Sequence, residues 1–356
     1  MNPRRAAIAG GVLAALMVIT AVIALSVHHV PSAGTNTIAA ADDTNDPALP
    51  SLAGSSDWIN TTPLSPAELA GKVVLVDFWD ASCINCRRTF PFLRGLETAY
   101  ASRGLVIVGV HSPEFGFEKS TAYVTREAKD LGVTWPVLND PDLKVWDSFQ
   151  NQYWPATYLA DRNGKVRLTE IGEGNDAQIE QGVRTLLNEG GDAGAATAMP
   201  EAGPPNPLTE ERYLGAERGS SSIAEGIVPA GQTVTRHDDK AGQDEIGLTG
   251  TFAGAEQYLV AQKGATVQLG FDAADVYTVV APDGAGPVTV TVTLDGKPLA
   301  PADRGKDVTV LSDGTTIATI TRDDLYTLVQ GSANREGELA LTVRDQPLSL
   351  FTFTFG

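Results

Sequence analysis

The stretch that decides the fold is Lys72–Cys86, with the sequence KVVLVDFWDASCINC. Its first half is an apolar run that carries one acid, Asp77, which is the pattern of a central strand buried on both faces. The second half holds Cys83 and Cys86, and residues 87–100 continue with a helical pattern. The two cysteines are therefore predicted to lie at a strand end and in the first turn of a helix.

This position predicts how the two thiols divide the chemistry. Unpaired N–H groups and the helix dipole stabilise an anion at a helix N-terminus, so the Cys83 thiolate should form more readily than that of a free thiol. Cys86 lies one turn further along, where it can close a disulfide but should be more buried. We expect Cys83 to attack a disulfide and Cys86 to resolve the mixed disulfide.

Composition narrows the classes of function. Of 356 residues, 42% are hydrophobic and 20% are charged, as in a folded protein of about two domains. A net charge of -18 would repel a phosphate backbone, which argues against nucleic acid. With two cysteines and four histidines, of which His111 alone is a nearby candidate ligand, we predict no metal site and no cofactor beyond a redox-active Cys83–Cys86 disulfide.

The N-terminus carries a long apolar run, Ala6–Val27, preceded by Arg4 and Arg5. This length can cross a bilayer as a helix, and the arginines predict a cytoplasmic N-terminus. A cleaved signal peptide is the alternative, with Ala39–Ala41 as a candidate cleavage site. Both alternatives place the remaining chain outside the cytoplasm, and we prefer anchoring to the cell membrane by residues 6–27.

Composition also divides the chain into segments. After the anchor or signal segment 1–30, residues 31–56 predict a flexible tether, and residues 190–208 predict a Pro/Gly/Ala linker. Residues 57–189 alternate strand-like and helix-like patterns, which predicts a mixed sheet covered by helices. Residues 209–356 show about nine strand-like runs with frequent turn signals, which predicts a β-sandwich.

Two local patterns make these predictions more specific. Asp161–Gly164 (DRNG) predicts a type I′ turn between two antiparallel strands of the α/β segment. Pro287–Leu294 (PVTVTVTL) alternates valine or leucine with threonine, as expected for a half-buried antiparallel strand of the sandwich.

Several separated motifs together resemble one protein family. They are Val76–Trp79 (VDFW), Ser82–Arg87 (SCINCR), Val110–Phe115 (VHSPEF) with Phe117 and Glu118, Tyr153–Ala156 (YWPA) and Gly172–Gly174 (GEG). Over about residues 58–187 the chain is similar to the thioredoxin-like periplasmic portion of DipZ proteins, within the exported thioredoxins related to TlpA and ResA. The resemblance implies a thioredoxin fold.

The resemblance also implies roles for individual residues. Asp77 matches a buried acid of thioredoxins, and Glu114 falls near an acid that relatives place beside the cysteines. Both are candidates for proton transfer to or from Cys86 if burial raises their pKa values. Pro155 should be a cis proline facing the cysteine pair, with Trp154 beside it, where an extended substrate chain can pair with the backbone.

One position departs from the family pattern. Relatives commonly carry Thr-Tyr where this chain has Asp80–Ala81. We expect Asp80 and Trp79 at the rim next to Cys83, as part of the substrate-binding surface. An acid there would oppose the Cys83 thiolate and lower its reactivity or change the choice of substrate.

The C-terminal segment resembles a second part of DipZ relatives. Tyr213–Gly215 (YLG) and Phe351–Gly356 (FTFTFG) are similar to their carbohydrate-binding-module-like jelly roll. The resemblance implies glycan binding. Residues 209–356 contain no tryptophan, however, so a docking or spacing role is an equal alternative.

The predicted function is an extracytoplasmic thiol–disulfide oxidoreductase that reduces, or alternatively oxidises, protein dithiol/disulfide substrates. Many DipZ proteins fuse this portion to an electron-transferring membrane domain, and here one span is predicted, so the donor would be a separate membrane protein such as a CcdA-like protein. Two alternatives stay open. One is an envelope glycan-binding or docking protein with a vestigial thioredoxin fold, and the other is a thiol peroxidase, although its usual Pro-x-x-x-Thr-x-x-Cys context is missing.

Overall fold

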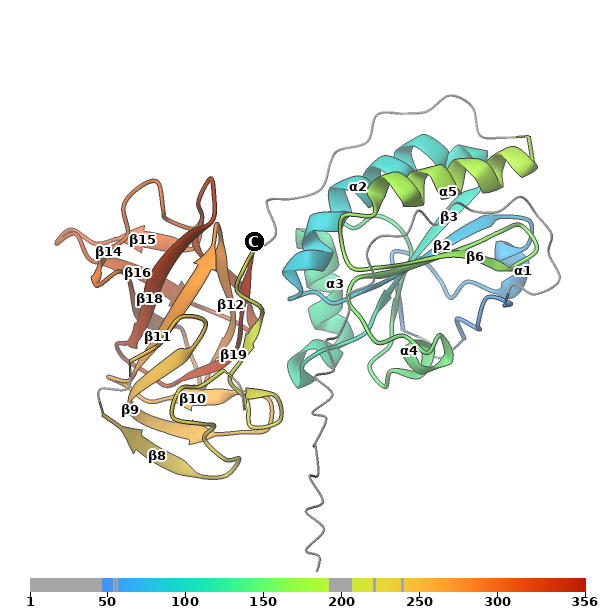
Figure 1. The fold of residues 1–356 in the computed structure, drawn as a ribbon. Coiled ribbons are helices and arrows are strands. Elements are labelled where there is room, and N and C mark those ends of the chain that lie inside the picture. The colour runs from blue at the N-terminus through green and yellow to red at the C-terminus, as the bar shows by residue number, and fades with distance from the viewer. Residues whose placement is uncertain (1–46, 54, 56, 192–206, 220–221, 238–239) are drawn as a thin grey trace, which may run out of the picture. The chain divides into compact units, whose positions relative to one another are not determined.

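The chain is described by a computed structural model that covers residues 47–53, 55, 57–191, 207–219, 222–237 and 240–356. Within residues 37–356, which form one compact unit, the described strands make two sheets (Figure 1). The predicted membrane or signal segment 1–30 and most of the predicted tether and linker lie outside the described residues. Among the helices described, none is long and apolar enough to span a membrane.

The first sheet has six strands in the order β1-β4-β3-β2-β5-β6. Strands β2, β3 and β4 are parallel, whereas β1, β5 and β6 are antiparallel to their neighbours. This mixed sheet is the predicted thioredoxin-like architecture. Its strands are β1 (Trp58–Ile59), β2 (Val73–Trp79), β3 (Leu105–His111), β4 (Val137–Asn139), β5 (Ala156–Ala160) and β6 (Val166–Ile171).

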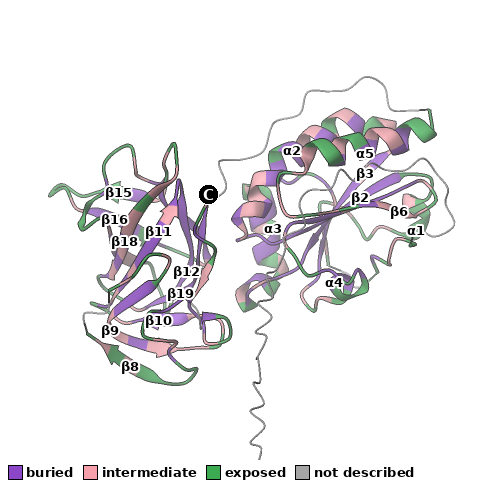
Figure 2. Cartoon of the chain, in the orientation of Figure 1, coloured by how far each residue is buried: buried purple, intermediate pink, exposed green. Residues whose placement is uncertain are grey.

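Helices cover both faces of this sheet. Every residue of β2 is therefore buried, as its unbroken apolar run predicts (Figure 2). Leu75 and Trp79 point into one core with α2 and α5, and Val76 and Phe78 point into another with α4. The helical segments are α1 (Pro66–Leu69), α2 (Ile84–Tyr100), η1 (Ala101–Arg103), η2 (Gly116–Lys119), α3 (Thr121–Asp130), α4 (Lys144–Ser148) and α5 (Asp176–Glu189).

The turn between β5 and β6 differs from the prediction. A type I′ turn needs two consecutive residues with positive φ, but here Gly164 has φ 72° and Asn163 does not share that conformation. The reason is the Asp161 side chain, whose Oδ1 accepts hydrogen bonds from the backbone N–H groups of Asn163 (2.9 Å) and Lys165 (3.0 Å). The loop is longer than predicted, and the pairing register shifts beside it.

The second sheet contains thirteen described strands rather than the nine predicted. The extra strands are short, and two or three residues are too few to produce a visible alternation. The predicted alternation of β13 is confirmed, since its valines and Leu294 are buried and its threonines are half-buried. The strands are β7 (Arg212–Tyr213), β8 (Thr233–Arg236), β9 (Ile246–Gly254), β10 (Leu259–Ala261), β11 (Thr266–Ala273), β12 (Val276–Pro282), β13 (Val288–Leu294), β14 (Lys297–Pro298), β15 (Val308–Val310), β16 (Thr316–Ile320), β17 (Asp324–Val329), β18 (Arg335–Val343) and β19 (Leu348–Phe355).

One strand joins the two halves of this β-sandwich into a nearly closed sheet. The first part of β9, Ile246–Thr249, pairs with β11, and the second part pairs with β8 and β10. Gly250 stands at the change of partner with φ 108°. A Cβ at this position would lie 2.8 Å from the Ala265 Cα, so the bend requires glycine.

We predict that Gly250→Ala destabilises the protein. The positive φ costs an L-residue about 1–2 kcal/mol, and the close approach to the Ala265 backbone adds roughly another 1–3 kcal/mol. The matched control is Gly264→Ala, which has φ 83° and open space around its Cβ, so only the first cost applies. Urea unfolding measures both variants, and equal losses would contradict the role of Gly250 at the bend.

Candidate active site

The cysteine pair lies where the sequence predicts. Cys83 is the N-cap of α2, and its Sγ accepts a hydrogen bond from the backbone N–H of Cys86 at 3.2 Å. Both side chains are free thiols, with Cys83 partly exposed and Cys86 fully buried. Solvent and substrate can therefore reach Cys83 first, which supports the predicted order of attack.

The ionisation of the pair differs from the prediction. Burial raises the pKa of Cys83, the thiol and backbone N–H of Cys86 oppose this effect, and the charges of Asp80 and Glu114 add to the increase. The helix N-terminus therefore does not make the Cys83 thiolate easier to form, because desolvation outweighs it. Burial also raises the pKa of Cys86 well above its usual value, so Cys83 stays the more readily ionised of the two.

Asp77 lies in the middle of the sheet on the same side as Cys86. Its carboxyl is buried, Oδ1 accepts a long hydrogen bond of 3.5 Å from the Thr157 hydroxyl, and Oδ2 has no partner among the described residues. Burial raises the pKa of Asp77 to about 8. Its charge in turn raises the pKa of Cys86, which places the two groups within electrostatic reach. Asp77 thus meets the condition set for a proton-transfer group.

Trp154 and Pro155 follow the expected local geometry. The bond between them is cis, as the resemblance implied. The Trp154 Nε1–H donates to the Ser112 carbonyl at 2.9 Å, and the indole packs against Trp146 with ring centres 4.3 Å apart. The side chain is half-buried and rests, like Cys83, against the core under α2. Their contact with a substrate remains a prediction.

The rim position predicted for Trp79 and Asp80 is wrong, because both side chains are completely buried. Asp80 turns inward since its carboxylate serves as acceptor for backbone N–H groups: Oδ1 for Ser82 (2.8 Å) and Oδ2 for Glu114 (3.2 Å). Neither side chain can line a substrate surface. The expected opposition of Asp80 to the Cys83 thiolate is still present, because its charge raises the pKa of Cys83 in addition to burial.

His111 is also enclosed beside Asp80. Burial lowers its pKa, so the imidazole is neutral, and its Nε2 accepts the Ala81 N–H at 3.3 Å. The ring packs edge-on against Trp79. These contacts describe a structural histidine. Across the described part of the chain, no group of three or more His, Cys, Asp or Glu side chains is arranged to hold a metal ion.

Sequence reasoning assigned no role to Glu118, although it is part of the family motif. This carboxyl is completely buried, and its Oε2 accepts the N–H groups of Glu114 (3.0 Å) and Phe115 (2.8 Å). Glu118 and Asp80 therefore share the Glu114 N–H as donor. Burial first, and then the charge of Asp80, raise the pKa of Glu118 well above its usual value.

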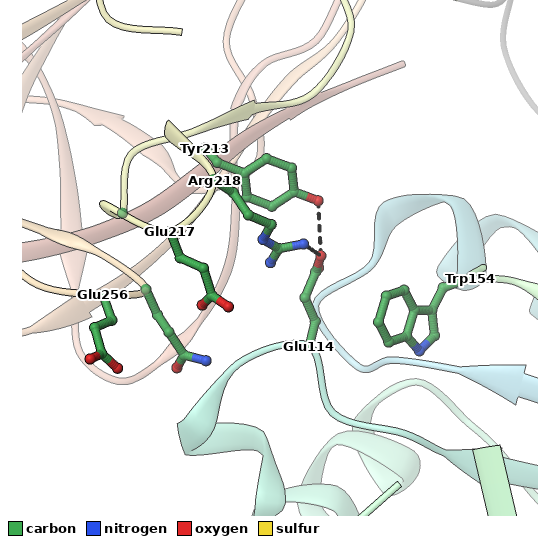
Figure 3. A pocket seen from close by; sticks show the side chains of 8 residues that line it. Glu114, Trp154, Tyr213, Glu217, Arg218 and Glu256 are labelled. Carbon is green, nitrogen blue, oxygen red and sulfur yellow. Dashed lines mark hydrogen bonds and ion pairs between the residues drawn. The ribbon is translucent and has the colours of Figure 1, made fainter. Parts of the chain in front are cut away.

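Glu114 is held by residues of the C-terminal sandwich. Its Oε1 accepts hydrogen bonds from the Tyr213 hydroxyl and from Arg218 Nη1, both at 2.8 Å (Figure 3). Burial raises the pKa of Glu114, and Arg218 opposes that rise. A pocket of about 240 Å³ lies here, lined by Glu114, Trp154, Tyr213, Gly215, Glu217, Arg218, Glu256 and Gln257. No local pattern in the sequence indicates this contact, because its partners are about a hundred residues apart.

Comparison with known proteins agrees with the two parts of the fold. The family model "Redoxin" matches residues 45–187, and the model "Thioredoxin like C-terminal domain" matches residues 209–356. Protein DipZ of Mycobacterium tuberculosis is 36% identical over 258 residues, which cover 70% of this chain and 36% of that protein. The resemblance to DipZ proteins is therefore confirmed, although the chain spans about a third of their length.

Two smaller relatives correspond to the first part alone. The thiol-disulfide oxidoreductase YkuV of Bacillus subtilis is 28% identical and covers 40% of this chain and 95% of its own length. The thiol-disulfide oxidoreductase ResA of the same organism is 26% identical and covers 46% of this chain and 85% of its own length. These relatives support the predicted class of thiol–disulfide oxidoreductase.

Asp77 predicts a pH dependence of stability. Its folded pKa of about 8 exceeds its usual value of 3.8, so the folded state holds a proton that the unfolded state has released. This contribution to the unfolding free energy is full below pH 4 and is lost as the pH rises through 8, at up to about 1.4 kcal/mol per pH unit. Asp77→Asn should remove that slope. Unfolding midpoints between pH 4.5 and 7.5 measure the difference, and parallel curves for both proteins would contradict it.

Proposed function

We propose that this chain is a thiol–disulfide oxidoreductase that reduces disulfides of protein substrates outside the cytoplasm. The observation that carries the proposal is the asymmetry of the cysteine pair: Cys83 is partly exposed at the start of α2, and Cys86 is buried one turn later. An accessible thiol with a protected partner in bonding reach suits two successive thiol–disulfide exchanges.

In the first exchange, the Cys83 thiolate attacks one sulfur of the substrate disulfide. A Cys83–substrate disulfide forms, the substrate S–S bond breaks, and the leaving thiolate takes a proton. In the second, Cys86 loses its proton and attacks Cys83 Sγ, which forms the Cys83–Cys86 disulfide and releases the second substrate thiolate. Two electrons pass from the pair to the substrate, and an external dithiol must return them.

Asp77 is the proposed proton partner of Cys86 in the second exchange. Water does not reach the buried Cys86, so its proton needs an internal acceptor. Burial raises the pKa of Asp77 to about 8, so its carboxylate is a stronger base than an ordinary carboxylate and is the better suited acceptor for the proton of a buried thiol. Glu114 is the second candidate for proton transfer. It is paired with Arg218, and its charge acts on Cys83.

The electrostatics of Cys83 support the proposed reducing direction. Strong oxidants of this kind stabilise their reduced form through a thiolate of low pKa. Here burial and the nearby acids raise the Cys83 pKa instead, so the dithiol form gains no such stabilisation and gives up its electrons more readily.

The setting of this activity is also part of the proposal. Residues 6–27 would anchor the chain to the cell membrane, and a separate membrane protein, such as a CcdA-like protein, would supply electrons. The likeness of residues 209–356 to a carbohydrate-binding-module-like jelly roll makes glycan binding a subsidiary proposal, and binding of the full chain to envelope glycans tests it independently of the cysteines.

We predict that Cys86→Ser traps mixed disulfides with protein substrates, because the bond to Cys83 forms but cannot be resolved. Non-reducing electrophoresis with mass spectrometry detects the trapped adducts. The matched control, Cys83→Ser, should trap none, because its remaining thiol is buried. Adducts that form through Cys86 in that control would reverse the assigned roles. Cys83-dependent consumption of peroxide without any disulfide reduction would instead favour the thiol peroxidase alternative.

A further inference from the structure

Ile84, the residue after Cys83, is covered by the C-terminal sandwich. Ile84 has only 8% of its surface exposed. It belongs to a buried apolar cluster in which Phe115 comes from the thioredoxin-like part and the other members come from strands β12, β17 and β19. These members are Tyr277, Val279, Ala281, Leu325 and Phe351. The first residue of the active-site helix thus packs against another sheet.

Polar contacts fasten the same helix beside this cluster. Arg87, the residue after Cys86, forms an ion pair with Asp324 at 2.8 Å, and each side chain is only 13% exposed. Arg88 Nη1 donates a long hydrogen bond of 3.5 Å to the Phe355 carbonyl. Because such partly buried ion pairs lose little to solvent screening, they hold the sandwich against the first turn of α2.

The sandwich also contacts the site through the loop after β3, whose Phe115 belongs to the same cluster as Ile84. Arg218 forms an ion pair with Glu114, and its Cζ lies 3.8 Å from the centre of the Tyr213 ring. The Gly116 N–H donates a hydrogen bond to Gln257 Oε1 at 2.9 Å. Phe115 packs against Phe351 with ring centres 5.0 Å apart. Both the start of α2 and the loop after β3 are therefore held by residues of the sandwich.

The pocket beside Glu114 and Trp154 is the recess that this arrangement leaves open. Glu114 acts electrostatically on Cys83, and Trp154 rests on the same core as Cys83. A volume of about 240 Å³ is enough for one or two side chains and too small for a folded surface. Glu217, Glu256 and Gln257 provide polar groups along the wall opposite Trp154. Such a wall can satisfy the backbone of an extended segment.

We propose that the C-terminal sandwich is one wall of the disulfide-exchange site, and that it restricts the site to disulfides on extended or unfolded polypeptide segments that approach beside Trp154. Attack requires the substrate sulfur to reach Cys83 Sγ at bonding distance. A flat, folded surface would collide with the sandwich above Ile84 before reaching it, whereas a chain one strand wide can pass. The proposal rests on the proposed function and names its substrate class.

The first experiment measures how fast the full chain reduces one disulfide substrate in its folded and in its unfolded form. The wild-type protein should reduce an unfolded polypeptide at least about tenfold faster than the same polypeptide folded with its disulfide at the surface. Val279→Asp places a charge in the Ile84 cluster and should separate the sandwich from α2, which removes the preference. Val310→Asp is the matched control, because Val310 is 44% exposed in the same sheet, and it should keep the preference.

A second measurement needs no change in the sandwich. The reaction rates of Cys83 with a small reagent, iodoacetamide, and a bulky one, a polymer-linked maleimide, are measured in the Cys86→Ser chain, folded and unfolded in urea. In the folded chain the rate of the bulky reagent relative to the small one should be at least about tenfold lower than in the unfolded chain. Equal ratios in the folded and unfolded chains would overturn the proposal even if Val279→Asp does not fold. Equal reduction of folded and unfolded substrates by the wild type would also overturn it. Absence of any Cys83-dependent reduction would refute the proposed function. The ratio of the two reagent rates would still test whether access to Cys83 is restricted.

Discussion

Burial of strand β2 on both faces is the constraint on which the site depends. The strand is inaccessible from Val73 to Trp79, and it continues through buried Asp80 and Ala81 to Cys83. Water is therefore excluded along the strand and its continuation, whereas Cys83 at the end of this segment is partly exposed. Such surroundings penalise the charged form of an acid or thiol, because a charge taken from water is costly.

This constraint explains the shared behaviour of the ionisable groups. Burial is the first cause of the raised pKa values of Asp77, Cys83, Cys86 and Glu118. Burial thus favours the protonated form of both thiols and of these two carboxyls. Chemistry begins at Cys83 because it is the member of the pair that solvent reaches, and the other groups move protons behind it.

The sequence was sufficient wherever the signal is local. The apolar run of β2, the helical pattern after Cys86 and the alternation of β13 each depend on neighbouring residues, and the structure contains all three. Family motifs added the cis bond before Pro155. Strands of two or three residues, such as β7 and β14, were missed because they are shorter than the pattern that reveals a strand.

The predictions that failed depend on contacts between distant residues. Asp80 turns inward because the Glu114 N–H, 34 residues later, needs its carboxylate. The expected ease of Cys83 ionisation was a local argument from the helix N-terminus, and it omitted the burial that the folded surroundings impose. The contacts of Glu114 with Tyr213 and Arg218 join residues about a hundred positions apart. No sequence pattern in a single chain reports such pairs.

The most direct test of the account is a redox titration of the full chain against a glutathione or dithiothreitol buffer, with the Cys83–Cys86 state read by mass. The account predicts one two-electron transition, with about 30 mV for each tenfold change, at a potential nearer to about -270 mV than to about -120 mV. A transition near the upper value would show an oxidant. Failure of the two thiols to form a disulfide would contradict the central claim that they act as one exchanging pair.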